Sequence, residues 1–231
     1  RHLTNLIKIK KELKIKSIFA YDTKNKTKFL GKDKNFIFTQ NLKEAADNCD
    51  VAFICVPTFL HNQTISKILK HTKCHFYIEK PLSSEIKDCL STLKKIKKIK
   101  KKVGIGYMFV NHPLILKTQS LIKQKEIGRI IFARAECGLY LPNWHPWENY
   151  RKFYMAHKNQ GGGVLLDTSH EINYLQRLFG NVKNVQGIVG KFSDLQITSD
   201  DLALSILNFK KNNIVAHVHL DLLQFERSRS F

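Results

Sequence analysis

The amino-acid sequence predicts an α/β fold: a doubly wound parallel sheet followed by an α+β domain with a largely antiparallel sheet. In the first half of the chain, short apolar runs alternate with amphipathic segments, and strands separated by helices of this length form right-handed crossovers. Residues 51–56 are apolar without interruption, which is typical of a strand buried on both faces. In the second half, the last strand-like runs follow one another without helices between them, so antiparallel pairing is expected.

Residues 1–108 are expected to form the parallel domain, because helical and strand-like runs alternate up to this point. The chain enters a helical pattern at once, and residues 17–22 then form a strand that ends in an acid. Further strands are predicted at residues 36–39, 51–56, 74–78 and 103–108, and helices at 41–47, 61–70 and 84–102. The last helix carries a lysine-rich solvent face over an apolar stripe that is expected to be buried, namely Leu90, Leu93, Ile96 and Ile99.

The pattern changes near Phe109, and residues 109–231 are expected to form the α+β domain. A helix over residues 113–125 should close at Gly128, since glycine commonly ends helices. A long strand, an aromatic loop and a helix that three glycines open are predicted at residues 130–140, 141–160 and 161–180. The last strands are predicted at residues 185–192, 201–209 and 214–222, with a hairpin turn at 210–213.

Composition and cysteine usage bound the class of protein. The 231 residues suit one large or two modest domains, and the apolar runs are strand-sized, so no membrane span is expected. No signal peptide is expected, because the first residues lead directly into a helical pattern. The five cysteines are scattered and form no C-x-x-C pair, which argues against a disulfide framework or a metal site and favours a reduced, cytoplasmic protein.

The formal charge of +20 raises the question of a nucleic acid or another polyanion as partner. Lysine supplies most of this charge, and it is spread along the chain beside abundant asparagine and isoleucine. An AT-biased coding sequence produces such usage without any acidic partner. We therefore expect no nucleic-acid partner, and keep a polyanion-binding protein as the less favoured alternative.

The glycine-led segment carries the most informative chemistry. Asp167 lies three residues before His170 and four before Glu171, so on one helix these groups share a face. An acid and an imidazole aimed at one opening are typical of proton transfer. An ordinary capped helix is the alternative interpretation of the same residues.

Two segments of the first domain lie where ligands bind in open α/β sheets, at the carboxyl ends of strands. Asp22 ends its strand, a position that commonly binds ribose hydroxyls, although an ordinary turn aspartate is an equal alternative. Pro57 and Thr58 end the next buried strand and precede His61, an arrangement that also suits a simple helix start. The glycine fingerprint G-x-G-x-x-G is absent from these residues.

The tripeptide Glu79-Lys80-Pro81 is a more specific sign of a ligand site than the two preceding segments. The following proline favours an extended Lys80, which would bring its amine to the carboxyl edge of the sheet. Partial burial can turn such a lysine into a usable acid or base. One surface lysine among many is the alternative.

The aromatic loop holds both tryptophans of the chain, Trp144 and Trp147, close to Tyr150. Aromatic faces beside hydrogen-bonding groups suit a sugar-like ligand. A packed domain interface would use the same residues, so the loop alone does not decide between the two.

Taken together, these segments resemble the Gfo/Idh/MocA family of NAD(P)-dependent sugar oxidoreductases (glucose–fructose oxidoreductase and inositol dehydrogenase). Their order and spacing span nearly the whole chain. The residues that carry the resemblance are Asp22, Pro57-Thr58 with His61, Glu79-Lys80-Pro81, Gly104-Ile105-Gly106-Tyr107, Asn111-His112-Pro113, and the run from Gly161 through Asp167 and His170. The form of the glycine-led segment resembles the branch with sugar-nucleotide and surface-glycan enzymes.

The resemblance implies a Rossmann domain that holds the dinucleotide and a second domain that faces the substrate. It implies hydride transfer between the nicotinamide and a carbinol or keto carbon of a sugar or sugar nucleotide, with Lys80, Asp167 and His170 as catalytic residues. NAD is favoured over NADP, because a 2′-phosphate would meet the carboxylate of Asp22. The implied cofactor-binding residues are Asp22, Pro57, Thr58, His61, Glu79, Lys80 and Pro81; the implied substrate-binding residues are Tyr107, Asn111, Trp144, Trp147, Tyr150 and Glu171.

Three further expectations follow from the resemblance. His170 follows Asp167 by three residues where many relatives have four, so either His170 or Glu171 is the group that reaches the substrate. Relatives begin with a strand and the glycine loop and continue beyond Phe231, so the chain resembles a member truncated at both ends. A homo-oligomer formed through the second sheet is expected, and a catalytically inactive relative that serves as a binding or assembly module is the main alternative.

Overall fold

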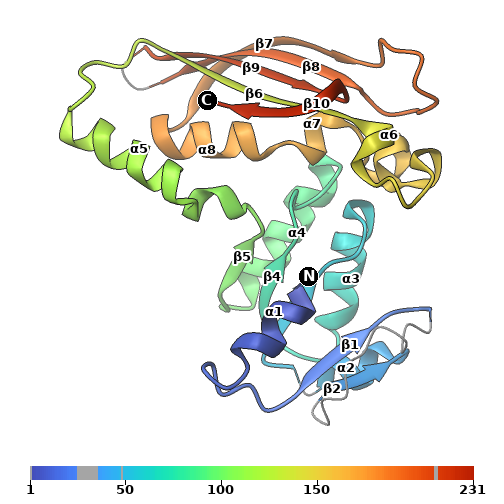
Figure 1. The fold of residues 1–231 in the computed structure, drawn as a ribbon. Coiled ribbons are helices and arrows are strands. Elements are labelled where there is room, and N and C mark those ends of the chain that lie inside the picture. The colour runs from blue at the N-terminus through green and yellow to red at the C-terminus, as the bar shows by residue number, and fades with distance from the viewer. Residues whose placement is uncertain (1, 25–35, 48, 211–212) are drawn as a thin grey trace.

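The structure is a computed structural model that describes residues 2–24, 36–47, 49–210 and 213–231. Figure 1 shows a lower body of short parallel strands and helices, and an upper body in which a five-stranded sheet lies over α5 (Pro113–Gln124) and α8 (His170–Phe179). The chain passes from the lower body to the upper one after β5 (Val103–Ile105). No helix in the described ranges is long and apolar enough to cross a membrane.

The lower body contains the strands and helices that the first half of the sequence predicts. Most of these elements begin later or end earlier than the sequence predicts. In chain order they are α1 (His2–Ile9), β1 (Ile18–Tyr21), β2 (Phe36–Thr39), α2 (Leu42–Asp47), β3 (Val51–Ile54), η2 (Thr58–Leu60), α3 (His61–Ile68), β4 (His75–Ile78), α4 (Ile86–Lys98) and β5.

All strand pairing in the lower body is parallel, as the alternating pattern predicts, but the strands form two sheets instead of one. One sheet is β1-β2 and the other is β3-β4-β5. In the doubly wound dinucleotide fold, the strand that precedes the first helix pairs on both of its sides. The described residues contain no strand before α1, and β1 and β3 each keep one unpaired edge.

The upper body is the mixed, largely antiparallel sheet that the second half of the sequence predicts. Its strand order is β10-β6-β9-β8-β7, in which only β6 and β9 run parallel. The fold class is therefore confirmed. The elements are η3 (Met108–Asn111), α5, β6 (Phe132–Tyr140), α6 (Leu141–Trp144), η4 (Tyr150–Lys152), η5 (Tyr154–Ala156), η6 (Lys158–Gln160), α7 (Val164–Asp167), α8, β7 (Val182–Gly190), β8 (Leu202–Phe209), β9 (Val215–Asp221) and β10 (Leu223–Ser230).

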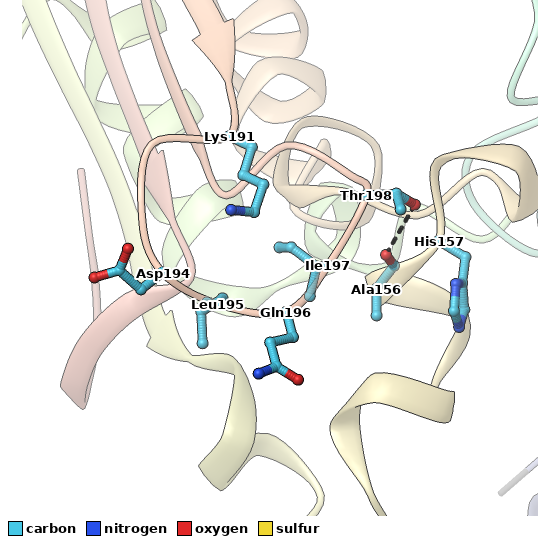
Figure 2. Close-up of a pocket in the computed structure, with 8 residues that line it drawn as sticks. All are labelled: Ala156, His157, Lys191, Asp194, Leu195, Gln196, Ile197 and Thr198. Carbon is cyan, nitrogen blue, oxygen red and sulfur yellow. Dashed lines mark hydrogen bonds between the residues drawn. The ribbon is translucent and has the colours of Figure 1, made fainter.

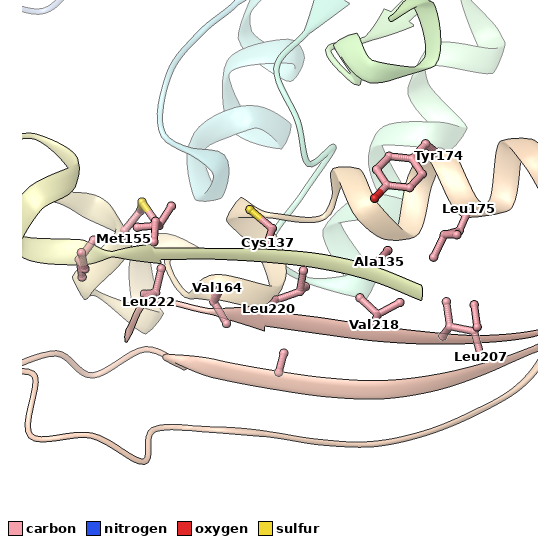
Figure 3. Close-up of a cluster of buried hydrophobic side chains, with 14 of the residues drawn as sticks. Ala135, Cys137, Met155, Val164, Tyr174, Leu175, Leu207, Val218, Leu220 and Leu222 are labelled. Atoms are coloured by element: carbon pink, nitrogen blue, oxygen red, sulfur yellow. The ribbon is translucent and has the colours of Figure 1, made fainter. Parts of the chain in front are cut away.

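Two hydrophobic clusters stabilise the two bodies. The larger cluster lies between α8 and the inward faces of β6, β8 and β9, where Leu175, Ala135 and Val218 are almost fully buried (Figure 3). The smaller cluster packs α3 and α4 on β3 and β4. Burial of each side chain of leucine size contributes roughly 1.5–3 kcal/mol. The two clusters share no residue, and the predicted division after residue 108 stays a prediction.

The apolar stripe predicted on α4 is only half covered. Ile96 is buried, and Ile99 packs against the smaller cluster. Leu90 and Leu93, one to two turns earlier, expose 55% and 40% of their surfaces. The prediction that the whole stripe is buried was therefore wrong, because the buried face of α4 passes through Thr92 and Ile96 and is rotated away from Leu90 and Leu93.

Candidate active site between the two bodies

The centre of the candidate site is a contact between Lys80 and Asp167, which lie 87 residues apart in the chain. Lys80 follows β4 at the carboxyl end of the parallel sheet, and Asp167 ends α7. The Lys80 Nζ atom donates to Asp167 Oδ1 over 3.0 Å and also to the backbone carbonyl of Asp167. Only 16% and 13% of the two side chains are exposed, so the ammonium and the carboxylate meet in a partly dry environment.

Tyr154 adds a third group to this contact. Its hydroxyl donates to the same Asp167 Oδ1 atom that Lys80 contacts. Burial, and next the negative charge of Asp167, raise the pKa of the Tyr154 phenol well above its usual range. The hydroxyl therefore stays protonated and acts as a hydrogen-bond donor.

The three glycines before α7 allow close packing. Gly161 has φ +74°, and a Cβ there would lie 2.8 Å from Ser84 Cβ and 3.1 Å from Thr58 Cβ, across the junction of the two bodies. Gly163 has φ +111° and lies against Asp200, whose Oδ2 accepts a hydrogen bond from Leu165 N over 2.8 Å. Asp200 thus satisfies a free amide at the start of α7.

The predicted single helix after the glycines is two helices. α7 ends at Asp167, and α8 begins at His170, with Thr168 and Ser169 between them. The Thr168 hydroxyl donates to the Val164 carbonyl and competes with a regular helical continuation. Because of this break, the positions of Asp167, His170 and Glu171 do not follow from helical spacing.

His170 is the second-domain histidine near the centre. Its ring meets the rings of Tyr107 and Phe109 edge to face, at centroid distances of 5.7 and 4.9 Å. Burial, and next the positive charges of Lys80 and Arg229, lower the pKa of His170 to about 4. Its Nδ1 atom is buried with no hydrogen-bond partner in the described part of the chain, which leaves Nε2 as the nitrogen available to a ligand.

Glu171 has a different environment. Its side chain has no exposed surface, and Oε1 lies 2.8 Å from Arg229 Nε on β10. The Arg229 guanidinium also covers the Phe109 ring and donates to Cys137 Sγ over 3.1 Å. Burial raises the pKa of the Glu171 carboxyl, an effect that Arg229 opposes. The charge of Lys80 acts on both groups that the sequence left open: it is the second cause of the lowered pKa of His170, whereas at Glu171 the ion pair with Arg229 outweighs it.

The aromatic loop forms a row of rings that ends at Tyr154. His145 stacks between Trp144 and Trp147, and its ring also meets Phe153 at 4.7 Å. Phe153 in turn meets Tyr154 at 4.6 Å.

The other residues implied as substrate contacts lie around this row. Tyr107 faces His170, and its hydroxyl lies 3.4 Å from Ser169 Oγ. Tyr150 lies beside the row, with its hydroxyl accepting from Gln196 N, whereas Asn111 is an exposed residue at the end of η3. The Arg227 guanidinium of β10 covers the Trp144 ring at 4.8 Å.

The residues expected at the cofactor lie at the carboxyl ends of the parallel strands. Asp22 follows β1, where its Oδ1 accepts from Lys24 N over 2.9 Å. Pro57 precedes η2, and Thr58 is buried against the glycines of the second domain. The Lys80–Pro81 peptide bond is cis. This edge is the ligand-binding edge of open α/β sheets.

His61 and Glu79, two of the expected cofactor residues, contact other residues of the lower body. His61 is 1% exposed, and its ring nitrogens lie 3.0 Å from the Val56 carbonyl oxygen and 3.3 Å from that of Leu82. Burial lowers its pKa, so a neutral ring donates to one of the two carbonyls. Glu79 contacts the imidazole of His2 on α1. His61 therefore fits a structural role, whereas Glu79 remains at the sheet edge.

One cavity lies away from this centre. It has a volume of about 360 Å³ and is formed by the loop between β7 and β8 and by the end of η5 with the following His157 (Figure 2). Lys80, Asp167 and Tyr154 do not line this cavity. Its lining residues are Ala156, His157, Lys191, Asp194, Leu195, Gln196, Ile197 and Thr198.

Four residues of the site escaped the sequence analysis: Tyr154, Phe109, Asp200 and Arg229. Each acts through a partner that is distant in sequence, so no local pattern marks it. The strand β10 is also hard to predict, because it is an edge strand whose residues are mostly polar and mostly exposed. No pattern of buried apolar residues therefore marks it in the sequence. The described residues contain no group of three or more His, Cys, Asp or Glu side chains that could hold a metal ion.

Comparison with known proteins agrees with this geometry. Residues 1–107 match the oxidoreductase family with an NAD-binding Rossmann fold, and residues 115–229 match the GFO/IDH/MocA C-terminal domain. Two curated relatives are each 26% identical: 2,7-anhydro-N-acetylneuraminate hydratase of Escherichia coli over 143 residues, and D-xylose dehydrogenase of Paenarthrobacter nicotinovorans over 147 residues. These matches cover 61% and 59% of this chain but only 36% and 35% of the two relatives.

A solved structure with the same fold is the WlbA dehydrogenase from Bordetella pertussis in complex with NADH and UDP-GlcNAcA. It has a TM-score of 0.74 and 15% sequence identity, and the superposition covers 91% of this chain and 64% of that one. The chain is thus shorter than its structural neighbours. Because the two matched family domains account for nearly all of its residues, the chain belongs to the Gfo/Idh/MocA family of oxidoreductases.

Proposed function

We propose that this protein is an NAD-dependent oxidoreductase that transfers a hydride between the nicotinamide and a carbinol or keto carbon of a sugar or sugar nucleotide. The observation that carries the proposal is the contact between Lys80 and Asp167. It joins an ammonium group at the ligand-binding edge of a parallel sheet to a carboxylate of the second domain. A partly buried charge pair at this place suits proton exchange with a substrate hydroxyl.

The residues at the sheet edge fit a dinucleotide. Asp22 would accept hydrogen bonds from the ribose hydroxyls, and its carboxylate would repel a 2′-phosphate, which favours NAD while NADP is the alternative. Thr58 and the Glu79–Lys80–Pro81 segment would lie against the ring. When bound, the nicotinamide accepts the hydride in the oxidative direction and supplies it in the reductive one.

The chain itself would handle the proton. In the oxidative direction the substrate hydroxyl loses its proton to the protein, and in the reductive direction it regains one. Lys80, held by Asp167, lies where it can exchange that proton. His170 is neutral at pH 7, since its pKa is lowered to about 4, and its Nε2 would accept a hydrogen bond from a sugar hydroxyl.

The ring row of the aromatic loop would form the wall of the substrate site. A sugar ring packs its C–H faces on aromatic rings, and Trp147 exposes 77% of its surface at the outer end of the row. Tyr107, Asn111, Trp144 and Tyr150 are the further proposed substrate contacts, whereas the buried Glu171 is left out of the set. The names of the relatives extend the substrates to be tried to D-xylose, 2,7-anhydro-N-acetylneuraminate and UDP-linked sugars.

The outer face of the five-stranded sheet supports the proposed homo-oligomer. Ile188, Leu204 and His219 lie side by side across β7, β8 and β9, and Ile188 exposes 61% of its surface. Ile206 and Phe132 add exposed apolar surface to the same face. Sedimentation velocity tests this proposal, and a monomer at every concentration would overturn it.

The decisive test of the function is titration with NADH, followed by nicotinamide fluorescence. The proposal predicts saturable binding that is tighter than the binding of NADPH, and NAD reduction with one member of a panel of sugars. A catalytically inactive module would bind without turnover of any panel member. Absence of binding would overturn the enzyme proposal, and a steeply salt-dependent affinity for nucleic acid would instead favour the polyanion alternative.

A further inference from the structure

The two oxygen atoms of the Asp167 carboxylate make different contacts. Its Oδ1 atom accepts from two donors, the Lys80 ammonium and the Tyr154 hydroxyl. Its Oδ2 atom accepts no hydrogen bond from the described part of the chain, and it is not among the buried polar atoms that lack a partner. At the junction of the two bodies, Asp167 is thus held through one oxygen, while the other accepts no hydrogen bond from the described residues.

Tyr154 is well placed to fix that orientation. It lies on η5, and its ring meets Phe153 at the inner end of the ring row. A phenol carries one donor proton, and the raised pKa of Tyr154 keeps that proton on the oxygen. Lys80 can rotate about its four-carbon stem, whereas the tyrosine ring turns about two torsions only, so Tyr154 is the stiffer of the two donors.

We propose that Tyr154 is a positioning residue of the active centre: together with Lys80 it holds Oδ1 of Asp167, so that Oδ2 is aimed at a substrate hydroxyl. This inference rests on the proposed function and adds a residue to it. The proposal also links the row of aromatic rings to the orientation of Asp167. Because Phe153 and His145 pack behind Tyr154, a substrate that presses on the row would press on the residue that orients Asp167.

The contact can be tested without cofactor or substrate. Tyrosine labelled with ¹³C at Cζ gives one resonance for each of the seven tyrosines, and the Tyr154→Phe variant identifies the signal of Tyr154. We expect this signal not to titrate over the alkaline range in which the protein stays folded. The Asp167→Asn variant should shift its titration to lower pH, because the negative charge is gone.

Tyr150 provides the internal reference for this measurement. Its pKa is lowered by Arg151, so its signal should titrate first and should not respond to the Asp167→Asn substitution. A Tyr154 titration that is the same in Asp167→Asn as in the unaltered protein would show that the hydroxyl is not held by this carboxylate. That result would overturn the inference without touching the proposed function.

Measurement of turnover provides a second test of the inference. Tyr154→Phe keeps the ring and removes one hydrogen bond to a charged group, so kcat should fall by about 10- to 100-fold with the NADH Kd unchanged. Tyr140→Phe is the matched control, because it removes a hydroxyl that has no hydrogen-bond partner in the described residues and whose ring stacks on Phe225. In an Asp167→Asn background the Tyr154→Phe effect should shrink, since the two residues act as a unit.

The two levels of proposal fail differently. If NADH does not bind to the unaltered protein, the proposed function fails. If NADH binds and turnover is found, but Tyr154→Phe and Tyr140→Phe give equal kcat values, then Tyr154 does not orient Asp167. A drop in melting temperature with an unchanged kcat would likewise assign Tyr154 to stability alone.

Discussion

Asp167 and Glu171 lie four residues apart, and the structure gives them opposite environments. Asp167 meets Lys80 and Tyr154 at the junction of the two bodies, with 13% of its side chain exposed. Glu171 meets Arg229 inside the upper body, with no exposed surface. The break between α7 and α8 separates them: it directs one carboxylate to the other domain and the other to the sheet. Each charge therefore has its own partner, and each pair can be broken separately.

The largest effect is expected from breaking the junction pair. Lys80→Met keeps the length of the side chain and removes the ammonium, so turnover should fall by about 10³-fold, which is within the usual range for loss of an acid–base group. The Kd for NADH, measured by fluorescence titration, should change little. Lys94→Met, at an exposed position of α4, is the control. Turnover of Lys80→Met within twofold of the unaltered protein would remove Lys80 from the mechanism.

Breaking the interior pair should act on stability instead. Arg229→Leu leaves the Glu171 charge buried without its partner, so the free energy of unfolding should fall by about 3–5 kcal/mol in urea titrations. Adding Glu171→Gln removes the stranded charge and should restore part of that loss. A loss of under about 1 kcal/mol in Arg229→Leu would place the pair among weak surface pairs, and would contradict its burial.

The smallest effect concerns the pH dependence of stability. The pKa of His170 is about 4 in the folded protein against 6.5 as the ordinary value. As the pH falls, the unfolded chain binds this proton first, so the contribution is fully present above pH 6.5 and is lost toward pH 4. The expected loss is about 3 kcal/mol. His170→Gln should flatten the dependence measured by urea unfolding; parallel curves would show that His170 is not held neutral.

The comparison also shows what the sequence can and cannot predict. The parallel strands, the mixed sheet and the approach of Lys80 to Asp167 follow from periodicity and from the resemblance, and the parallel and mixed sheets are present in the structure. The break at Thr168 was not predictable from spacing, since helical periodicity does not record the bond from the Thr168 hydroxyl to the Val164 carbonyl that accompanies it. Tyr154 and Arg229 were missed because their partners lie 13 and 58 residues away.

One consequence of the glycine packing concerns the distance between the two bodies. At Gly161 the backbone of the upper body comes so close to Ser84 and Thr58 that one added carbon would lie 2.8 Å from its neighbour. Any larger residue at this position would push the two bodies apart. The distance from Lys80 Nζ to Asp167 Oδ1 would then increase. The absence of a side chain at Gly161 thus allows the close approach of the two bodies at which Lys80 Nζ meets Asp167 Oδ1.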